Sequence, residues 1–272
     1  MSHPLPALFQ GPASQPRLVA IPRLAAGGRW RVEAMRTLSE PCLLWFTRGQ
    51  GRITVAGVTR GYGANTAVFL PAGVMHGFEV GPQTFGTAIF FGSETPLHLP
   101  NQPHHLRIRE NTAQLELNQA LDAIAREMAS AKPASERAVL AHLHLLSVWL
   151  ERQIAQAPTE ETPLPASARR LVSRFTDLLE RDFKSGAGVG DYASALGVTP
   201  THLSRVCRAT SGKSAKELLS DRLLFEARKM LSETQIPVQE VASRLGFGSA
   251  AYFTRAFQHH TGKTPTDFRR LH

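Results

Sequence analysis

The sequence predicts a two-domain α+β protein: an antiparallel β sandwich or barrel in the first half, and an all-α domain with two helix-turn-helix motifs in the second. Three observations carry this prediction. They are short apolar runs punctuated by glycine, a proline-rich stretch near the middle, and an internal repeat in the second half. A chain of 272 residues is long enough for two domains that each bury their own core.

The first domain is expected over residues 1–111, and its strands fall within residues 17–91. Short apolar runs there are separated by Gly-rich breaks such as Gly49-Gln50-Gly51. Many short runs at regular spacing with glycine punctuation favour antiparallel strands. The clearest runs are residues 43–46, 52–55, 66–70 and 88–91.

The middle of the chain predicts two amphipathic helices and a linker. Apolar residues recur at helical spacing on both sides of a break at Lys132-Pro133, within residues 112–156. These helices could pair two chains or pack on their own barrel. Residues 157–166 contain three prolines and are expected to form a stiff, exposed linker.

The second half, residues 167–272, contains an altered copy of itself. The segment 189–213 recurs as 238–263, and each copy is predicted to be a helix, a tight turn and a second helix. The helix-turn-helix motifs are expected at about 189–212 and 238–262. The identical pairs are Val189/Val238, Ala193/Ala242, Ser194/Ser243, Leu196/Leu245, Gly197/Gly246, Arg205/Arg255, Gly212/Gly262 and Lys213/Lys263.

Capping residues place the helices within each copy. Asp191 is expected to cap the first helix, and Gly197 supplies the left-handed residue that ends it. Thr199 and Pro200 then begin the second helix. In the second copy Ser249 takes the place of Thr199, after a turn that is one residue longer. The apolar face of the last helix is expected to comprise Tyr252, Phe253, Ala256 and Phe257.

A continuous helix predicted at about 214–234 joins the two motifs. At 1.5 Å per residue it spans roughly 30 Å, close to one turn of B-DNA, so both second helices could enter successive major grooves. Charge points the same way, because residues 167–272 hold 17 Lys/Arg against 10 Asp/Glu. The alternative is a purely structural helical domain with a duplicated packing unit.

Residues 167–272 resemble the DNA-binding domain of the AraC/XylS family of bacterial transcription regulators. The resemblance implies a protein that binds double-stranded DNA, works as a dimer and has RNA polymerase as a further partner. The matching stretches are Ala193–Gly197, Leu203-Ser204-Arg205, Gly212-Lys213-Ser214, Arg222-Leu223, Ile236–Val241, Gly246-Phe247, Phe253-Thr254-Arg255-Ala256-Phe257, Gly262-Lys263-Thr264-Pro265 and Phe268-Arg269.

The resemblance also implies which residues face the bases. Arg205 and Arg255 can each bond the O6 and N7 atoms of a guanine, whereas two alanines in the second copy offer only apolar contact. For Arg255 the alternative is an ion pair within the protein. The implied positions are Thr201, Ser204 and Arg205 in the first copy, and Ala250, Ala251, Thr254 and Arg255 in the second.

The first half resembles the cupin-like jelly roll found at the front of many AraC-type regulators. The stretches that match are Gly51–Val55, Gly63–Leu70, Pro71-Ala72-Gly73 and His76. A barrel of this kind can hold a small ligand. Four residues are expected to line a pocket for an organic effector, or else to be plain core: Arg36, Trp45, His76 and Phe78.

No metal site, cofactor or enzymatic activity is expected. Metal-binding cupins place two His and a Glu on one strand, whereas here His76 and Glu79 have no second His before His98. Two alternatives remain: a cupin metalloenzyme fused to a DNA-binding domain, and a DNA-binding protein indifferent to any effector. The sequence lacks an apolar run of membrane-spanning length and a secretory signal pattern, so we expect a cytoplasmic protein without a membrane partner.

Overall fold

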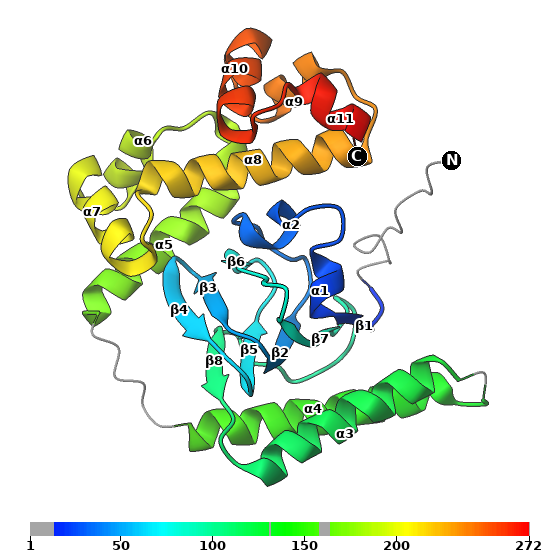
Figure 1. Ribbon diagram of the computed structural model, residues 1–272. Helices are drawn as coiled ribbons and strands as arrows, with labels where there is room; N and C mark the ends of the chain where they lie inside the picture. Colours follow the sequence, from blue (N-terminus) through cyan, green and yellow to red (C-terminus); the bar gives the residue numbers. More distant parts are fainter. Residues whose placement is uncertain (1–13, 131, 158–163, 272) are drawn as a thin grey trace.

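The computed structural model describes residues 14–130, 132–157 and 164–271. Most of the expected linker, at residues 158–163, and the N-terminal stretch used to exclude a signal sequence therefore lie outside the described residues. Two antiparallel sheets and a helical hairpin form the N-terminal half, and the C-terminal half is entirely helical (Figure 1). The predicted fold class is confirmed.

Eight strands form the two sheets of the N-terminal domain. The larger sheet has the order β1 (Arg17–Ala20), β7 (Phe85–Phe90), β2 (Cys42–Arg48), β5 (Thr66–Leu70), β8 (His104–Arg107). The smaller sheet has the order β4 (Val58–Tyr62), β3 (Gly51–Val55), β6 (His76–Phe78). Two short helices, α1 (Ile21–Leu24) and α2 (Trp30–Glu33), follow β1.

The larger sheet is covered on both faces. Leu44 and Phe46 of β2 point into the core between the two sheets, whereas Leu43 and Trp45 point to the opposite side. Successive side chains of a strand alternate between faces, so a strand buried on both sides is a continuous apolar run. This is why residues 43–46 show no polar alternation.

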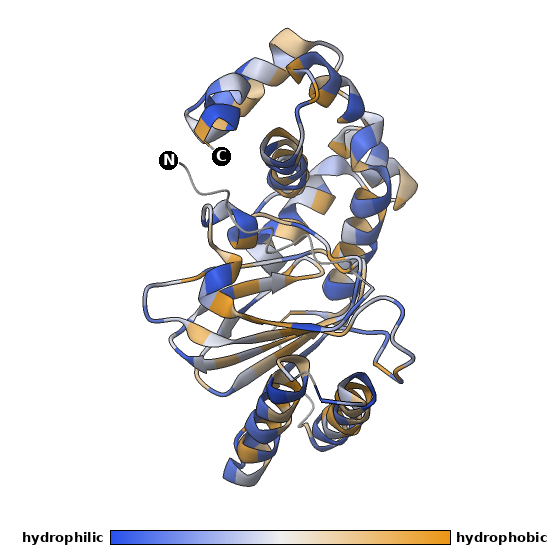
Figure 2. Cartoon of the chain, turned by 90° about the vertical axis from the view of Figure 1, so that its right-hand side faces the viewer, coloured by the Kyte–Doolittle hydropathy of each residue, from blue (hydrophilic) through white to orange (hydrophobic). Residues whose placement is uncertain are grey.

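A helical hairpin covers the second face of the larger sheet. Helices α3 (Asn111–Met128) and α4 (Ser135–Gln156) pack against it through residues such as Leu117 and Leu143 (Figure 1; Figure 2). The predicted helices therefore pack on their own barrel. Their outer side remains apolar in places, since Leu145 is 65% exposed.

The C-terminal domain is built from seven α-helices and one short 3₁₀ helix within the described residues. Its core is formed by residues such as Phe175, Leu203 and Phe257, all fully buried. The helices are α5 (Ala166–Asp182), η1 (Phe183–Ser185), α6 (Val189–Ala195), α7 (Pro200–Ser211), α8 (Ala215–Glu233), α9 (Val238–Arg244), α10 (Ala250–Thr261) and α11 (Pro265–Leu271).

The two domains contact each other closely, and α5 and α8 lie over the β domain (Figure 1). Thr37 donates a hydrogen bond to Glu180 of α5 at 2.8 Å. The ring of Trp30 lies 5.8 Å from that of Phe225 on α8. Met35 belongs to the same apolar cluster as the C-terminal core. In the described part of the chain, no helix is long and apolar enough to cross a bilayer.

Candidate DNA-binding surface

Each helix-turn-helix motif is held by local caps. Thr199 Oγ1 accepts a hydrogen bond from the backbone N–H of His202, and Ser249 Oγ accepts one from Tyr252, both at 3.2 Å. These two predicted N-caps are confirmed. The prediction for Asp191 is wrong: α6 begins at Val189, and the Asp191 carboxylate, one turn inside, accepts a bond from the N–H of Gly188 at 2.8 Å. The physical reason is that Gly188 is the cap and Asp191, three residues later, accepts from the cap's own N–H, which is one half of a capping box.

The second helix of the first motif, α7, presents a polar face to solvent. Thr201 and Arg205 are exposed and Ser204 is half-buried. On the opposite face Leu203 and Cys207 are fully buried in the domain core. The three residues that the resemblance assigns to base contact therefore share the outer side of α7.

The matching helix of the second motif, α10, has the same organisation. Ala251 and Arg255 are exposed, and Ala250 and Thr254 are half-buried. Phe253 anchors the helix in the core. Within the described residues Arg255 has no ion pair, so its guanidinium is available to an external acceptor.

The electrostatics of the two helices suit a polyanion. Neither α7 nor α10 contains an aspartate or glutamate. Several acidic side chains of the domain are instead bound by its own cations elsewhere: Glu180 and Glu226 by Arg222, for example. Because α7 and α10 contain arginines and no acid, these two helices carry positive charge.

Two residues of this surface, His202 and Tyr252, were not assigned to it from the sequence. His202 Nδ1 lies 3.0 Å from Arg205 Nη2 and orients that guanidinium. The expectation that Tyr252 belongs to the apolar face is wrong, because its side chain is 58% exposed. It lies in the first turn of α10, where the ring can remain in solvent beside Phe247. Both residues lie within the helices predicted to contact DNA, and this position in the sequence could have identified them as part of the surface.

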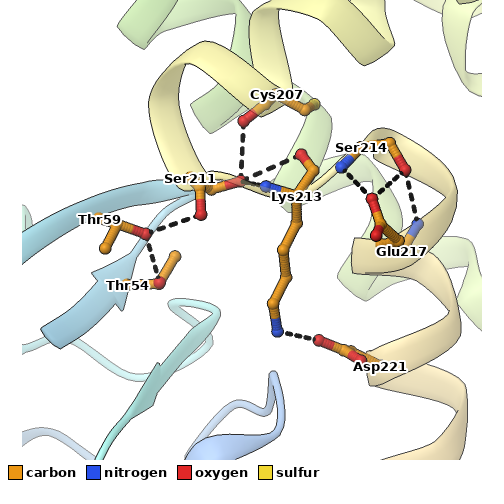
Figure 3. Close-up of polar contacts among 8 residues, drawn as sticks. All are labelled: Thr54, Thr59, Cys207, Ser211, Lys213, Ser214, Glu217 and Asp221. Carbon is orange, nitrogen blue, oxygen red and sulfur yellow. Dashed lines mark hydrogen bonds and ion pairs between the residues drawn. The ribbon is translucent and has the colours of Figure 1, made fainter.

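The connector α8 is fixed at its start and in its middle. Ser214 and Glu217 form a capping box, with the Ser214 N–H donating to Glu217 at 2.6 Å (Figure 3). Arg222 is 5% exposed and binds both oxygens of Glu180, at 2.6 and 2.9 Å. Burial opposes the charge of Arg222, but the hydrogen bonds that it donates to Glu180 and Glu226, and their negative charges, outweigh burial and raise the pKa of Arg222.

The β domain also touches the first motif. Thr59 of β4 donates a hydrogen bond to the carbonyl of Ser211 at 3.2 Å, at the C-terminal end of α7 (Figure 3). The Ser211 hydroxyl in turn donates to Cys207, and Lys213 forms an ion pair with Asp221 of α8 (Figure 3). The end of α7, the start of α8 and the β domain are thus joined by one set of polar contacts.

Comparison with known proteins agrees with this geometry. A family model described as a helix-turn-helix domain matches residues 192–271. YfiF of Bacillus subtilis, an uncharacterized transcriptional regulator of helix-turn-helix type, is 31% identical over 146 residues, which are 51% of this chain and 45% of YfiF. The arabinose operon regulatory protein of Escherichia coli is 31% identical over 125 residues, 46% of this chain and 42% of that protein. The chain therefore spans about half the length of these two relatives.

A shorter relative is covered almost completely. The probable transcription factor PqrA of Proteus vulgaris is 32% identical over 104 residues, which are 38% of this chain and 85% of PqrA. The chain belongs to the AraC/XylS family of transcription regulators. This is a family of regulators rather than of enzymes.

In the N-terminal domain of this AraC/XylS regulator, Arg36, His76 and Phe78 lie near one another, but of these three only Arg36 lines the cavity described below. Arg36 and His76 are paired through their backbones, and the Arg36 guanidinium carbon lies 5.6 Å from the centre of the Phe78 ring. The prediction for Trp45 is wrong. Its indole lies on the other face of the sheet and donates to Asn118 of α3 at 2.9 Å.

Arg36 is buried and forms no ion pair with any residue that the structure describes. Its side chain is 3% exposed, and its Nε and Nη1 atoms have no hydrogen-bond partner within the described residues. Burial lowers the pKa of Arg36 to about 10, an effect that the nearby Cys42 only partly offsets. Burial, together with the charge of Arg36, lowers the pKa of His76 to about 3, so this imidazole is neutral.

Arg36 lines a cavity of about 640 Å³ between the two domains. The other walls include Thr37 and Glu40 from the β domain, and Phe225 and Lys229 from α8. Three cations of the lining are paired with acids: Arg17 with Glu40, Arg31 with Glu233, and Arg222 with Glu226. Among the described residues Arg36 and Lys229 are the lining cations without an ion pair.

The residues considered for a metal site are engaged separately. The Nδ1–H of His76 donates to the carbonyl of Val74 at 2.9 Å, and Glu79 accepts hydrogen bonds from Arg52. Over residues 14–130, 132–157 and 164–271, no three His, Cys, Asp or Glu side chains gather as a metal site would require.

Proposed function

We propose that this chain is a sequence-specific DNA-binding transcription regulator that reads a two-part site and is controlled by a small anionic effector. One observation carries the DNA-binding part. Two acid-free recognition helices, each with an exposed arginine, are joined by a connector of 19 residues. Such a connector spans about 28 Å, which suits half-sites about one helical turn apart.

The effector part rests on Arg36. A buried charge without a partner is costly, so proteins rarely keep one unless a ligand or another charge compensates it. A carboxylate entering the cavity would bring a negative charge beside Arg36, and Lys229, a further cation of the lining, could reach the same anion from α8. Trp30 and Phe225 offer apolar walls for the rest of the molecule.

Effector control follows from where the cavity lies. Its lining includes Arg222, Phe225 and Lys229 of α8, the helix that carries both motifs. A ligand can shift the DNA-binding domain only through unequal affinity for two arrangements of the chain. A cavity shared by the β domain and the connector provides such a difference, because it changes whenever the two move apart.

Selection of the full chain against a random duplex pool, at fixed near-physiological salt, tests the DNA-binding function. Salt is fixed because phosphate contacts make affinity strongly salt-dependent. We expect a two-part site with halves about one helical turn apart. Enrichment of no sequence would contradict the proposal.

Titration with straight-chain carboxylates and with alcohols of the same chain lengths tests the effector. We expect carboxylates, but not alcohols, to change affinity for the selected site. An Arg36→Met variant should lose this response and, without ligand, gain about 1 kcal/mol or more of stability, because an uncompensated buried charge is removed. The effector assignment fails if alcohols act as carboxylates do, or if the variant responds like the parent chain.

Assembly and location belong to the same proposal. Leu115 and Leu145 lie exposed on the outer side of the α3–α4 hairpin and suit pairing with a second copy. A protein that regulates bacterial genes acts where the DNA is, so we place it in the cytoplasm. Contact with RNA polymerase stays a prediction. The division of the chain into four units also stays a prediction, with bounds at 1–111, 112–156, 157–166 and 167–272.

A further inference from the structure

The turns of the two helix-turn-helix motifs have different surroundings. Gly197 and Gly246 occupy equivalent positions in the repeat, and both are left-handed, with φ of +70° and +76°. A Cβ added at Gly197 would meet no atom within 4 Å. A Cβ added at Gly246 would lie 2.4 Å from the backbone nitrogen of Gly186 and 2.6 Å from the carbonyl oxygen of Lys184. The second glycine therefore has a role beyond its backbone conformation.

The opposing backbone belongs to the loop that precedes the first motif. Gly186 is also left-handed, at φ +82°, and a Cβ there would lie 2.9 Å from the carbonyl oxygen of Gly246. Two backbones approach this closely only where neither residue carries a side chain. We call this contact between Gly186 and Gly246 the glycine joint.

The glycine joint adds a second connection between the second motif and the segment that leads into the first motif. Helix α8 links them along the chain, and the joint links the loop before α6 directly to the turn between α9 and α10. Lys184 of η1, directly before that loop, also binds Glu226 of α8 at 2.9 Å. The loop is therefore tied to both the second motif and the connector, which closes a triangle of contacts around α8.

We propose that the glycine joint fixes the separation and rotation of α7 and α10, and hence the base-pair spacing that the protein accepts between its half-sites. Gly186 and Gly246 are then positioning residues, acting on DNA through the recognition helices. This inference rests on the proposed DNA-binding function. With a rigid reader, one added base pair turns the second half-site by about 34° and moves it out of reach.

The experiment measures binding of the full chain to its selected site with the spacing between halves varied one base pair at a time. We expect the parent chain to prefer one spacing, with neighbouring spacings bound about ten-fold or more weakly. Gly246→Ala should flatten this preference to about three-fold or less, because the added methyl must push the two backbones apart. Gly197→Ala is the matched control, since it suffers the same left-handed strain without the contact.

Each outcome decides the inference. It is overturned if Gly246→Ala keeps the parent's spacing preference, or if Gly197→Ala loses it equally. Should Gly246→Ala fail to fold, Gly186→Ala perturbs the joint from the other side and should flatten the same preference. Equal binding of all spacings by the parent chain would also overturn it, whereas failure to enrich any site would instead reject the proposed function.

Discussion

At the scale of single residues, the N-terminal domain buries two basic side chains, Arg36 and His76, that form no ion pair with an acid among the described residues. Arg36 keeps its charge, whereas His76 gives up its proton and uses Nδ1–H to bond the carbonyl of Val74. The pKa of His76 lies at about 3 in the folded chain and near 6.5 in the unfolded chain. Between these two pH values the unfolded chain binds a proton at His76 and the folded chain does not.

This difference predicts a pH-dependent stability. As the pH falls from about 6.5 toward 4, the free energy of unfolding should decrease by about 1.4 kcal/mol per pH unit on account of His76. His76→Asn keeps a donor for Val74 but cannot titrate, so its unfolding free energy should fall less steeply. Urea unfolding at a series of pH values measures both slopes. Equal slopes for the two chains would show that His76 does not titrate as described.

At the scale of elements, the α3–α4 hairpin has two apolar sides. The inner side packs on the larger sheet, and Leu145 stands out from the other side. We expect Leu145→Glu to turn a dimer into a monomer, because a charge would be buried in the interface. Arg137→Glu places the same charge on an exposed polar position of α4 and should leave the dimer intact. Analytical ultracentrifugation of the parent chain and the two variants measures their oligomeric state. A parent chain that is monomeric at micromolar concentration would contradict dimerisation through this hairpin.

The sequence predicted where helices and strands lie better than it predicted which side of each one is buried. The repeat located both helix-turn-helix motifs because capping residues such as Thr199 and Ser249 act locally. Trp45 was misplaced because its strand is apolar on both faces, so alternation cannot tell which side meets the second sheet. Tyr252 was misplaced because an aromatic residue at helical spacing is usually buried, and only the finished packing around Phe247 leaves it outside.

At the scale of the whole molecule, Glu180 joins the two domains. It binds Arg222 within the C-terminal domain and accepts the hydrogen bond of Thr37 from the β domain. No local pattern could predict this meeting, since residues 37, 180 and 222 are far apart in the sequence. The cavity beside Arg36 escaped prediction for the same reason: one wall belongs to each domain.

Glu180 therefore stabilises the fold mainly through its contact with the buried Arg222, and less through the hydrogen bond that it accepts from Thr37. Glu180→Gln leaves the buried Arg222 with Glu226 as its remaining acid, and we expect a loss of about 2 kcal/mol. Thr37→Val removes only the interdomain hydrogen bond and should cost about 1 kcal/mol or less. Denaturant unfolding of the full chain compares them, and an equal loss in both variants would refute this ranking.

The measurement that tests the central claim most directly is the binding of the parent chain, Arg205→Ala and Arg255→Ala to the selected site and to every single base substitution of it. If the two recognition helices read separate half-sites, Arg205→Ala should become indifferent to a base in one half, and Arg255→Ala to a base in the other. Each lost preference should amount to about 1–3 kcal/mol. A uniform loss of affinity for all sequences in both variants would show that these arginines contact only phosphates, and would contradict the account.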